Sequence, residues 1–240
     1  MKVCIIGSYA KALVMTADRI PVAGETLMGR DYRGEFGGKG SDMAVQSSRL
    51  GAEVSYIGVI GDDTFGKEFV DLMKDEKIDI SGLRITKEKS TGTGFIIKDI
   101  EARNVIVVDS GANDLFSKED IDNAEKLIEE ADVVLAQLEI PLDTALYAMK
   151  VAKKYGKTTI LNPAPAVNLK ECDLSDVDIL TPNETEARVA VGVPTDSELT
   201  NSEIAEMLFK TGCKKIIMTL GDPESLSQVW QDRYSHIRSK

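Results

Sequence analysis

Short apolar runs alternate with helical patterns of apolar residues along most of the chain. The runs at 3–7, 54–61, 133–137, 158–161 and 215–221 have the length and composition of buried strands. Between them, apolar residues recur every three or four positions, as in 65–73 and 142–152, which is typical of amphipathic helices. This alternation predicts an α/β fold in which a mostly parallel central sheet carries helices on both faces. Ligands are expected at the carboxyl ends of the strands.

Two stretches interrupt the alternation. Residues from about 13 to 36 and from about 91 to 109 are extended in pattern and punctuated by turn residues, such as Pro21 and Gly24 in the first stretch. Such sequence favours short strands joined by tight turns. We expect the two stretches to form a small antiparallel β-lid.

Composition limits the domain count and the partners. The chain has 240 residues, 42% of them hydrophobic, with no low-complexity linker and no repeat. One globular unit with the lid attached as a small subdomain is therefore expected. The formal net charge of -11 offers no basic surface to nucleic acid or to an anionic membrane, so we expect neither as a partner.

The cysteines bear on the cellular compartment. Cys4, Cys172 and Cys213 show no CxxC spacing and no neighbouring histidine cluster, so neither a zinc site nor a disulfide framework is indicated. We expect a cytoplasmic protein. The apolar run at 3–6 is too short for a signal peptide or a membrane span.

The first motif that suggests a chemical role is FGGKG, from Phe36 to Gly40. Its glycines predict a tight loop at the start of a helix, where backbone amides and the positive helix end favour an oxygen-rich ligand. Lys39 adds a side-chain donor. The motif is not a Walker loop, because the nearest match, Gly34 to Lys39, is one residue short and lacks the required Ser or Thr. Taken alone, a purely structural glycine turn remains the alternative.

A second motif, TPNETEA, begins at Thr181 and places Asn183 and Glu186 three residues apart after a strand. An amide oxygen and a carboxylate in this position suit a hydrated magnesium ion and the phosphates it carries. The same pair would also form an ordinary helix N-cap. The residues leave both interpretations open.

Two further candidate positions follow apolar runs. Glu139 comes just after the run at 133–137, where a carboxylate can accept hydrogen bonds from neighbouring hydroxyl groups, although a solvated surface glutamate is the alternative. Thr219 and Gly221 end the last run. A glycine there can admit a nucleotide or simply interrupt the strand.

FGGKG, LNPAP at 161–165, TPNETEA and IMTLG at 217–221, in this order, resemble the ribokinase family of carbohydrate kinases. The resemblance runs from Met1 to about Gly221. It implies a central sheet with flanking helices, and a β-lid that covers the sugar and pairs two subunits in a homodimer. It also implies transfer of the γ-phosphoryl group of ATP to a sugar hydroxyl, with Mg²⁺ and often a monovalent cation such as K⁺. The sugar expected from it is D-ribose, giving ribose 5-phosphate.

The site residues implied by the resemblance fall into two groups. The sugar side consists of Gly38, Lys39, Asp42 and Glu139; the nucleotide side consists of Asn183, Thr219 and Gly221 at ATP, and Glu186 as the carboxylate linked to magnesium.

Three departures from the family pattern change this picture. Ala10 and Ala12 stand where an asparagine and an aspartate usually hold sugar hydroxyls, and each lost partner weakens binding by about 1 to 3 kcal/mol. Asp42 stands where asparagine is usual, which removes two donors and adds a negative charge. The family's Gly-Ala-Gly-Asp segment, with its anion hole and aspartate base, does not occur in the 240 residues. No catalytic residue is therefore assigned, and Asp114, in the turn after the lid, is expected to start a helix.

We therefore expect a ribokinase-like domain over 1–221 with the C-terminal part of the fold missing. Residues 222–240 hold the only tryptophan and the only histidine. We interpret them as a non-family tail outside the sheet, either frayed, foreign or frame-shifted, with an amphipathic helix as the alternative. One functional hypothesis is a ribokinase-type sugar kinase, shortened or completed by a partner. The other is an inactive truncated kinase that acts as a ligand-binding or dimerisation module.

Overall fold

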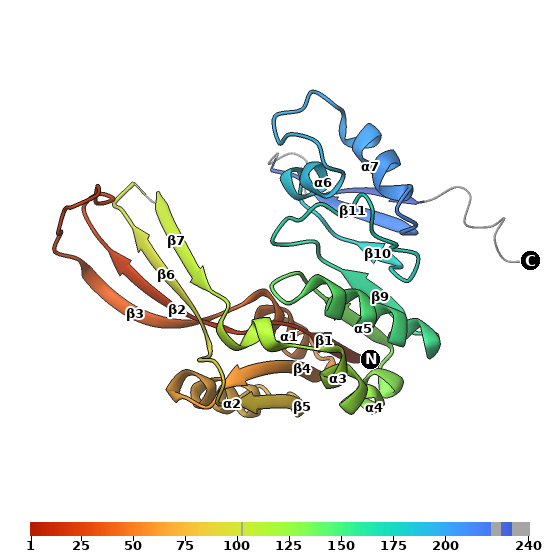
Figure 1. Ribbon diagram of the computed structural model, residues 1–240, viewed down its shortest axis with the longest axis horizontal. Helices are drawn as coiled ribbons and strands as arrows, with labels where there is room; N and C mark the ends of the chain where they lie inside the picture. Colours follow the sequence, from red (N-terminus) through yellow and green to blue (C-terminus); the bar gives the residue numbers. More distant parts are fainter. Residues whose placement is uncertain (102, 222–226, 232–240) are drawn as a thin grey trace, which may run out of the picture.

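The computed structural model describes residues 1–101, 103–221 and 227–231. The main sheet consists, in spatial order, of β12 (Ser227–Gln231), β11 (Lys215–Thr219), β10 (Ile179–Leu180), β9 (Thr158–Leu161), β8 (Val133–Ala136), β1 (Lys2–Ile6), β4 (Glu53–Gly61) and β5 (Asp79–Thr86). Neighbouring strands run parallel except β12, which is antiparallel to β11. The mostly parallel sheet expected from the apolar runs is confirmed (Figure 1).

The helices are α1 (Lys39–Arg49), α2 (Thr64–Asp75), α3 (Lys118–Asn123), α4 (Glu125–Glu130), α5 (Leu142–Lys154), α6 (Glu184–Ala190) and α7 (Asn201–Phe209), with a 3₁₀ helix η1 (Gly111–Leu115). Alternation along β1 shows why both faces of the sheet are covered. Ile6 packs in the core cluster that contains Met149 of α5, whereas its neighbour Ile5 packs in the cluster that contains Phe69 of α2. Successive strand residues point to opposite faces, so a fully apolar strand needs helices on both sides.

The lid is a separate four-stranded sheet in the order β3 (Arg30–Gly37), β2 (Ala10–Thr16), β6 (Gly92–Lys98) and β7 (Asn104–Asp109). It projects from the main sheet, at the left in Figure 1. The expected fully antiparallel lid is wrong in one pairing, because β2 and β6 are parallel. Each follows a strand of the main sheet, β1 and β5 respectively, and so both run outward from the same edge, while β3 and β7 return beside them.

A partly buried ion pair ties the base of the lid to the main domain. The Lys11 ammonium in β2 lies 2.6 Å from the Glu68 carboxylate of α2, and its side chain is only 9% exposed. The ammonium also lies 4.6 Å from the centre of the Phe36 ring in β3. A charge removed from water to this extent needs such partners, and these contacts therefore hold the first lid strand against α2.

Some elements were not expected from the sequence. β5 carries Gly82 and several polar residues and lacks a continuous apolar run, and β10 has only two residues. The apolar stripe from Ile121 to Ile128 does not form one helix, because the backbone at Ala124 leaves helical geometry between α3 and α4. Ser117 and Asp120 form a capping box at the start of α3.

The expectation that the sheet ends before residue 222 is wrong for residues 227–231. They form β12, in which Trp230 is paired with Ile216 of β11 and packs against the larger core cluster. Val229 beside it is 60% exposed. A single inward-facing aromatic residue was too weak a pattern to predict a strand. The other parts of the expected tail, 222–226 and 232–240 with His236, lie outside the described residues.

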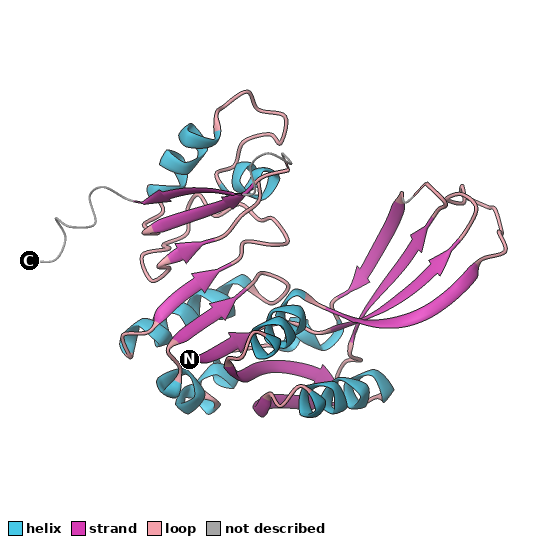
Figure 2. Ribbon diagram, turned by 180° about the vertical axis from the view of Figure 1, so that it is seen from behind, coloured by secondary structure: helices cyan, strands magenta, loops and turns pink. Residues whose placement is uncertain are grey.

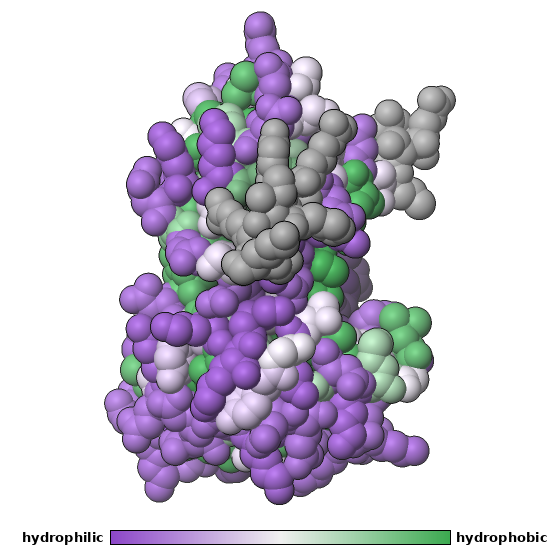
Figure 3. Space-filling view, turned by 90° about the vertical axis from the view of Figure 1, so that its right-hand side faces the viewer, coloured by the Kyte–Doolittle hydropathy of each residue, from purple (hydrophilic) through white to green (hydrophobic). Residues whose placement is uncertain are grey.

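The main sheet and the lid are seen from the opposite direction in Figure 2, which again shows the lid standing away from the main sheet. The side of the molecule away from the lid is mostly hydrophilic (Figure 3). None of the helices in the described part of the chain combines the length and apolar character that crossing a bilayer requires.

Candidate active site

The GGKG loop and Glu139 come together at the carboxyl edge of the sheet. Glu139 follows β8, and its Oε2 accepts hydrogen bonds from the Ser8 hydroxyl at 2.6 Å and from the Lys39 backbone amide at 2.7 Å. Lys39 is the first residue of α1. The carboxylate therefore lies at the N-terminus of a helix of 11 residues, where the helix dipole favours negative charge.

Gly38 is required at the start of α1 for two reasons. Its φ is 91°, in the left-handed region that favours glycine, and a Cβ there would lie 2.8 Å from the Ala10 amide nitrogen. The loop can therefore pack directly on the backbone that leads into β2. This contact explains why the glycine motif and the first lid strand share one wall of the site.

A pocket of about 590 Å³ opens between this edge and the lid. Gly38 and Glu139 line it, together with residues from β2, β6 and β7 of the lid and from the segments that follow β7, β8 and β9. Its size is in the range for small-molecule sites, and its position at the carboxyl ends of parallel strands is where such folds bind ligands.

Asp42 lies in the first turn of α1, and its side chain is exposed. Partial removal of the carboxyl group from water, together with the negative charge of Glu139, raises the pKa of Asp42, while Lys39 opposes the effect. Asp42 therefore belongs to the same electrostatic environment as Glu139. It is not among the residues that line the pocket.

Two polar residues at the pocket were not among the predicted site residues. Ser8 links Glu139 to the GGKG loop. Its hydroxyl donates to Glu139, and its oxygen accepts from the Gly40 amide at 3.3 Å. Asn113 in η1 bonds both the amide and the carbonyl group of Tyr9. Ser8 follows a glycine at the end of the first strand, which could have marked it. No local pattern links Asn113 to Tyr9.

Asp114 also lines the pocket, within η1. Its carboxylate pairs with the Lys89 ammonium at 2.8 Å. Asp114 was expected to lie after the lid at the start of a helix, and the structure places it after β7 in η1. That the 240 residues hold no catalytic base stays a prediction.

The nucleotide-side residues form a second cluster along the same edge. Asn183 and Glu186 make a reciprocal capping box at the start of α6, with distances of 2.7 and 2.8 Å. Thr219, at the end of β11, forms a parallel bridge with Asn183. The Gly221 amide donates to Glu184 Oε2 at 3.2 Å. The structure therefore brings these residues together, although they are not among the lining residues of the large pocket.

The nucleotide side fits a magnesium ion that is completed by water and phosphate oxygens. The capping box uses Oε2 of Glu186, Asn183 is exposed, and Glu186 is half-buried. Within the described residues, no three His, Cys, Asp or Glu side chains come together as a metal cage. Mg²⁺ commonly binds through one or two carboxylates plus substrate phosphates, and this cluster can offer such a partial set of ligands.

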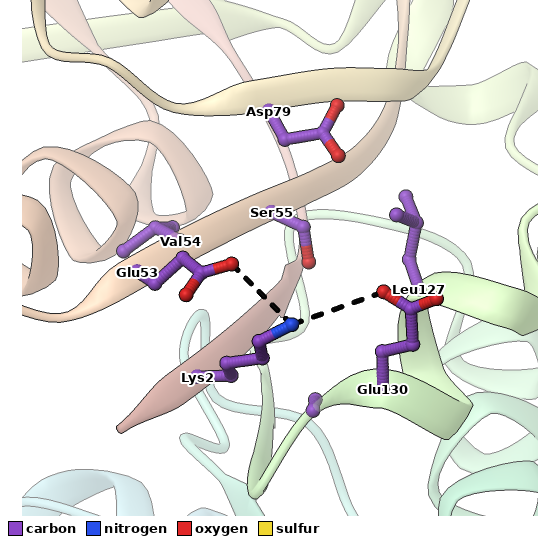
Figure 4. Close-up of a pocket in the computed structure, with 8 residues that line it drawn as sticks. Lys2, Glu53, Val54, Ser55, Asp79, Leu127 and Glu130 are labelled. Atoms are coloured by element: carbon purple, nitrogen blue, oxygen red, sulfur yellow. Dashed lines mark ion pairs between the residues drawn. The ribbon is translucent and has the colours of Figure 1, made fainter.

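A smaller pocket lies at the opposite, amino edge of the sheet, beside β1, β4 and β5 (Figure 4). It has a volume of about 50 Å³, and Lys2 makes ion pairs with Glu53 and Glu130 there. Its volume is far below the range of small-molecule sites. The candidate active site is the pocket beneath the lid, which combines a volume in that range with a position at the carboxyl edge of the sheet.

The chain is similar to known proteins over most of its length. Residues 1–227 match the family model described as pfkB family carbohydrate kinase. The chain is 37% identical over 217 residues to a ribokinase of Haemophilus influenzae, covering 90% of this chain and 71% of that protein. It is 32% identical over 240 residues to a deoxyribokinase of Salmonella typhi, covering 99% and 77%. A solved structure, Arabidopsis thaliana ribokinase complexed with ribose and ATP, superposes with a TM-score of 0.82 at 25% identity, covering 96% and 77%.

Proposed function

Because the chain belongs to the pfkB family of carbohydrate kinases, we propose that it transfers the γ-phosphoryl group of ATP to a pentose. D-ribose, phosphorylated to ribose 5-phosphate, is the substrate that the resemblance implies. The observation that carries the proposal is Glu139, which is held by Ser8 and by the first amide of α1 at the base of the pocket. The curated relatives named as ribokinases and a deoxyribokinase support a pentose substrate.

On the sugar side, the residues bind and orient the acceptor. Glu139 Oε2 is occupied by its two protein donors, and we assign the second oxygen, Oε1, to a sugar hydroxyl. Lys39 and Asp42 flank it on α1. A fixed carboxylate at a helix N-terminus holds a hydroxyl group in one orientation, which is how positioning accelerates a transfer reaction.

On the nucleotide side, we assign Asn183, Thr219 and Gly221 to ATP and Glu186 to magnesium through water. Magnesium would neutralise phosphate charge. Phosphoryl transfer depends mainly on positioning and on charge stabilisation, so these residues and the sugar side would act together. A monovalent cation such as K⁺ is included on the resemblance alone.

The outer face of the lid supports a homodimer. Leu13, Phe95 and Val107 lie in one cross-strand row, and Phe95 and Val107 are 57% and 65% exposed. Exposed apolar surface of this kind marks an interaction site, and we assign it to a second copy of the chain. Val107→Asp is expected to shift sedimentation from dimer to monomer. Ile85→Asp, at an exposed apolar residue of β5 in the main sheet, is the control.

The sugar-kinase function is assigned to the α/β domain together with its lid. The cytoplasm is proposed as its compartment because Cys4, Cys172 and Cys213, all in the described part of the chain, form no disulfide with one another. The alternative is an inactive module that binds ligand or dimerises without turnover. It is favoured by Ala10 and Ala12, which line the pocket and offer no polar side-chain group to a sugar.

The test is release of ADP by the 240-residue chain with ATP, Mg²⁺ and D-ribose, with and without K⁺. Glu139→Ala is expected to reduce the rate at low ribose concentration at least tenfold, because a site group for a hydroxyl is lost. Asp132→Ala is the matched control, since Asp132 precedes the same strand β8 at the opposite edge, where it accepts the Lys2 amide. Ribose binding without turnover would favour the alternative, and neither binding nor turnover would refute both.

A further inference from the structure

The lid wall of the pocket carries no polar side-chain atom. It consists of Ala10 and Ala12 of β2, Gly94 and Ile96 of β6, and Ile106 and Val108 of β7. All six side chains are aliphatic or absent. A sugar with a full set of hydroxyl groups would meet only hydrocarbon and backbone on this side.

The pairing of the lid strands places this wall on one face. Ala12 is opposite Gly94, Gly94 is opposite Val108, and Ile96 is opposite Ile106. Residues opposite each other in a sheet point to the same side, and alternate residues along a strand share a face. The apolar wall is therefore continuous across three strands, and it does not depend on the position of any single flexible side chain.

The polar groups at the base of the pocket are already largely engaged with the protein. Both ends of the Asn113 amide bond the Tyr9 backbone, Asp114 pairs with Lys89, and Ser8 bonds Glu139 and the Gly40 amide. Hydrogen bonds for a ligand are therefore concentrated near Glu139 and the start of α1. The pocket has a polar end and an apolar wall.

We infer that the site selects a pentose that lacks a hydroxyl group on its lid-facing edge, that is, a deoxypentose, over fully hydroxylated ribose. This inference rests on the proposed function, since it concerns the sugar of the same site. A hydroxyl group covered by the lid would lose its water partners and find no replacement, whereas a methylene group would gain apolar contact. Ala10 and Ala12 are thus the specificity-determining residues.

The test measures equilibrium binding of D-ribose, 2-deoxy-D-ribose and 3-deoxy-D-ribose to the 240-residue chain by calorimetry, without nucleotide. At least one deoxypentose is expected to bind about tenfold more tightly than ribose, which corresponds to about 1.4 kcal/mol. Because binding is measured directly, the result does not depend on turnover.

The double variant Ala10→Asn/Ala12→Asp supplies an amide and a carboxylate to the same wall. It is expected to bind ribose about tenfold more tightly than the wild type does and to reverse the preference. Ile100→Asn adds the same amide at an exposed residue, 68% accessible, in the turn between β6 and β7, and is expected to leave the ratio unchanged. If the double variant does not fold, Ala12→Ser replaces it, with the same direction and a smaller shift.

The outcomes separate the two claims. Ribose binding to the wild type as tightly as both deoxypentoses would overturn the inference and leave the proposed function standing. The absence of pentose binding by both the wild type and the double variant would refute the proposed function and the inference together. A deoxypentose preference that the double variant reverses supports both.

Discussion

The sugar side and the nucleotide side of the candidate active site are built in different ways. On the sugar side, Glu139 bonds Ser8 and Lys39, which lie 131 and 100 residues away in sequence. On the nucleotide side, Asn183 and Glu186 bond each other across three residues. The first arrangement requires that β1, β8 and α1 are already assembled, whereas the second needs only one turn of α6.

Burial follows the same division. Ser8 and Gly40 on the sugar side are buried, while Asn183 on the nucleotide side is exposed. Close packing of backbone leaves no room for relaxation, so a change on the sugar side should affect the stability of the whole domain. A change on the nucleotide side should affect one helix end. The predictions below test this difference, beginning with the largest effect.

Gly40→Ala should be strongly destabilising. A Cβ at Gly40 would lie 2.5 Å from the Ser8 amide nitrogen and 2.7 Å from the Gly7 carbonyl carbon, so backbone would have to move. We expect the free energy of unfolding to fall by about 3 kcal/mol, the upper part of the range for overpacking. Urea unfolding followed by circular dichroism measures this change.

Gly51→Ala is the matched control for this substitution. Gly51 adopts a positive φ, 88°, whereas Gly40 is a helical residue of α1, and a Cβ at Gly51 would meet nothing within 4 Å. Its cost should be limited to the backbone conformation, about 1 to 2 kcal/mol. Equal losses in the two variants would show that the GGKG loop is not tightly packed against β1.

Replacing Glu139 or Glu186 by glutamine should weaken the binding of one ligand without affecting the other. Glu139→Gln is expected to weaken ribose binding about tenfold and to leave MgATP binding unchanged, because it removes a charge-assisted acceptor on the sugar side only. Glu186→Gln should do the reverse. Calorimetric titration with each ligand checks both variants, and a loss of both affinities in either one would mean that the two clusters form a single unit.

The sequence was sufficient for elements with strong local patterns. The apolar runs located β1, β4, β8, β9 and β11, and the helical patterns at 65–73 and 142–152 located α2 and α5. β5 was not predicted, because an edge strand needs no continuous apolar run. β12 was not predicted, because Trp230 was its only strong inward-facing residue. The parallel pairing of β2 with β6 depends on where two distant strands leave the main sheet.

In the candidate site too, local contacts could be predicted from the sequence and long-range contacts could not. The capping box of Asn183 and Glu186 is visible in seven residues of sequence, although its ligand role is not. The bond from Ser8 to Glu139 and the attachment of Asn113 to Tyr9 join residues more than 100 positions apart. No local pattern specifies such contacts, and they are fixed only when the sheet and η1 pack together.

Asn183→Ala should have a moderate and local effect. Asn183 is the N-cap of α6, and its Oδ1 accepts a hydrogen bond from the Glu186 amide at 2.7 Å. Loss of this cap should lower the free energy of unfolding by about 1 kcal/mol. MgATP affinity should fall as well. Thr200→Ala removes the corresponding cap of α7 and should give a similar loss of stability without a change in MgATP binding. Unchanged MgATP affinity in Asn183→Ala would contradict the nucleotide assignment.

The smallest effect is expected at Asp42, where the sugar side places two carboxylates near each other. Partial desolvation and the charge of Glu139 raise the pKa of Asp42 above its ordinary value of 3.8, so the folded state holds this proton more tightly than the unfolded chain does. The resulting stability is present at low pH and is lost as the pH rises through the raised pKa.

Asp42→Asn should therefore raise the melting temperature at pH 7 and have less effect at pH 3. Because the side chain is exposed, solvent screening should keep the gain at about 1 °C. A lower melting temperature of Asp42→Asn at pH 7 would show that the charge at this position stabilises the sugar side.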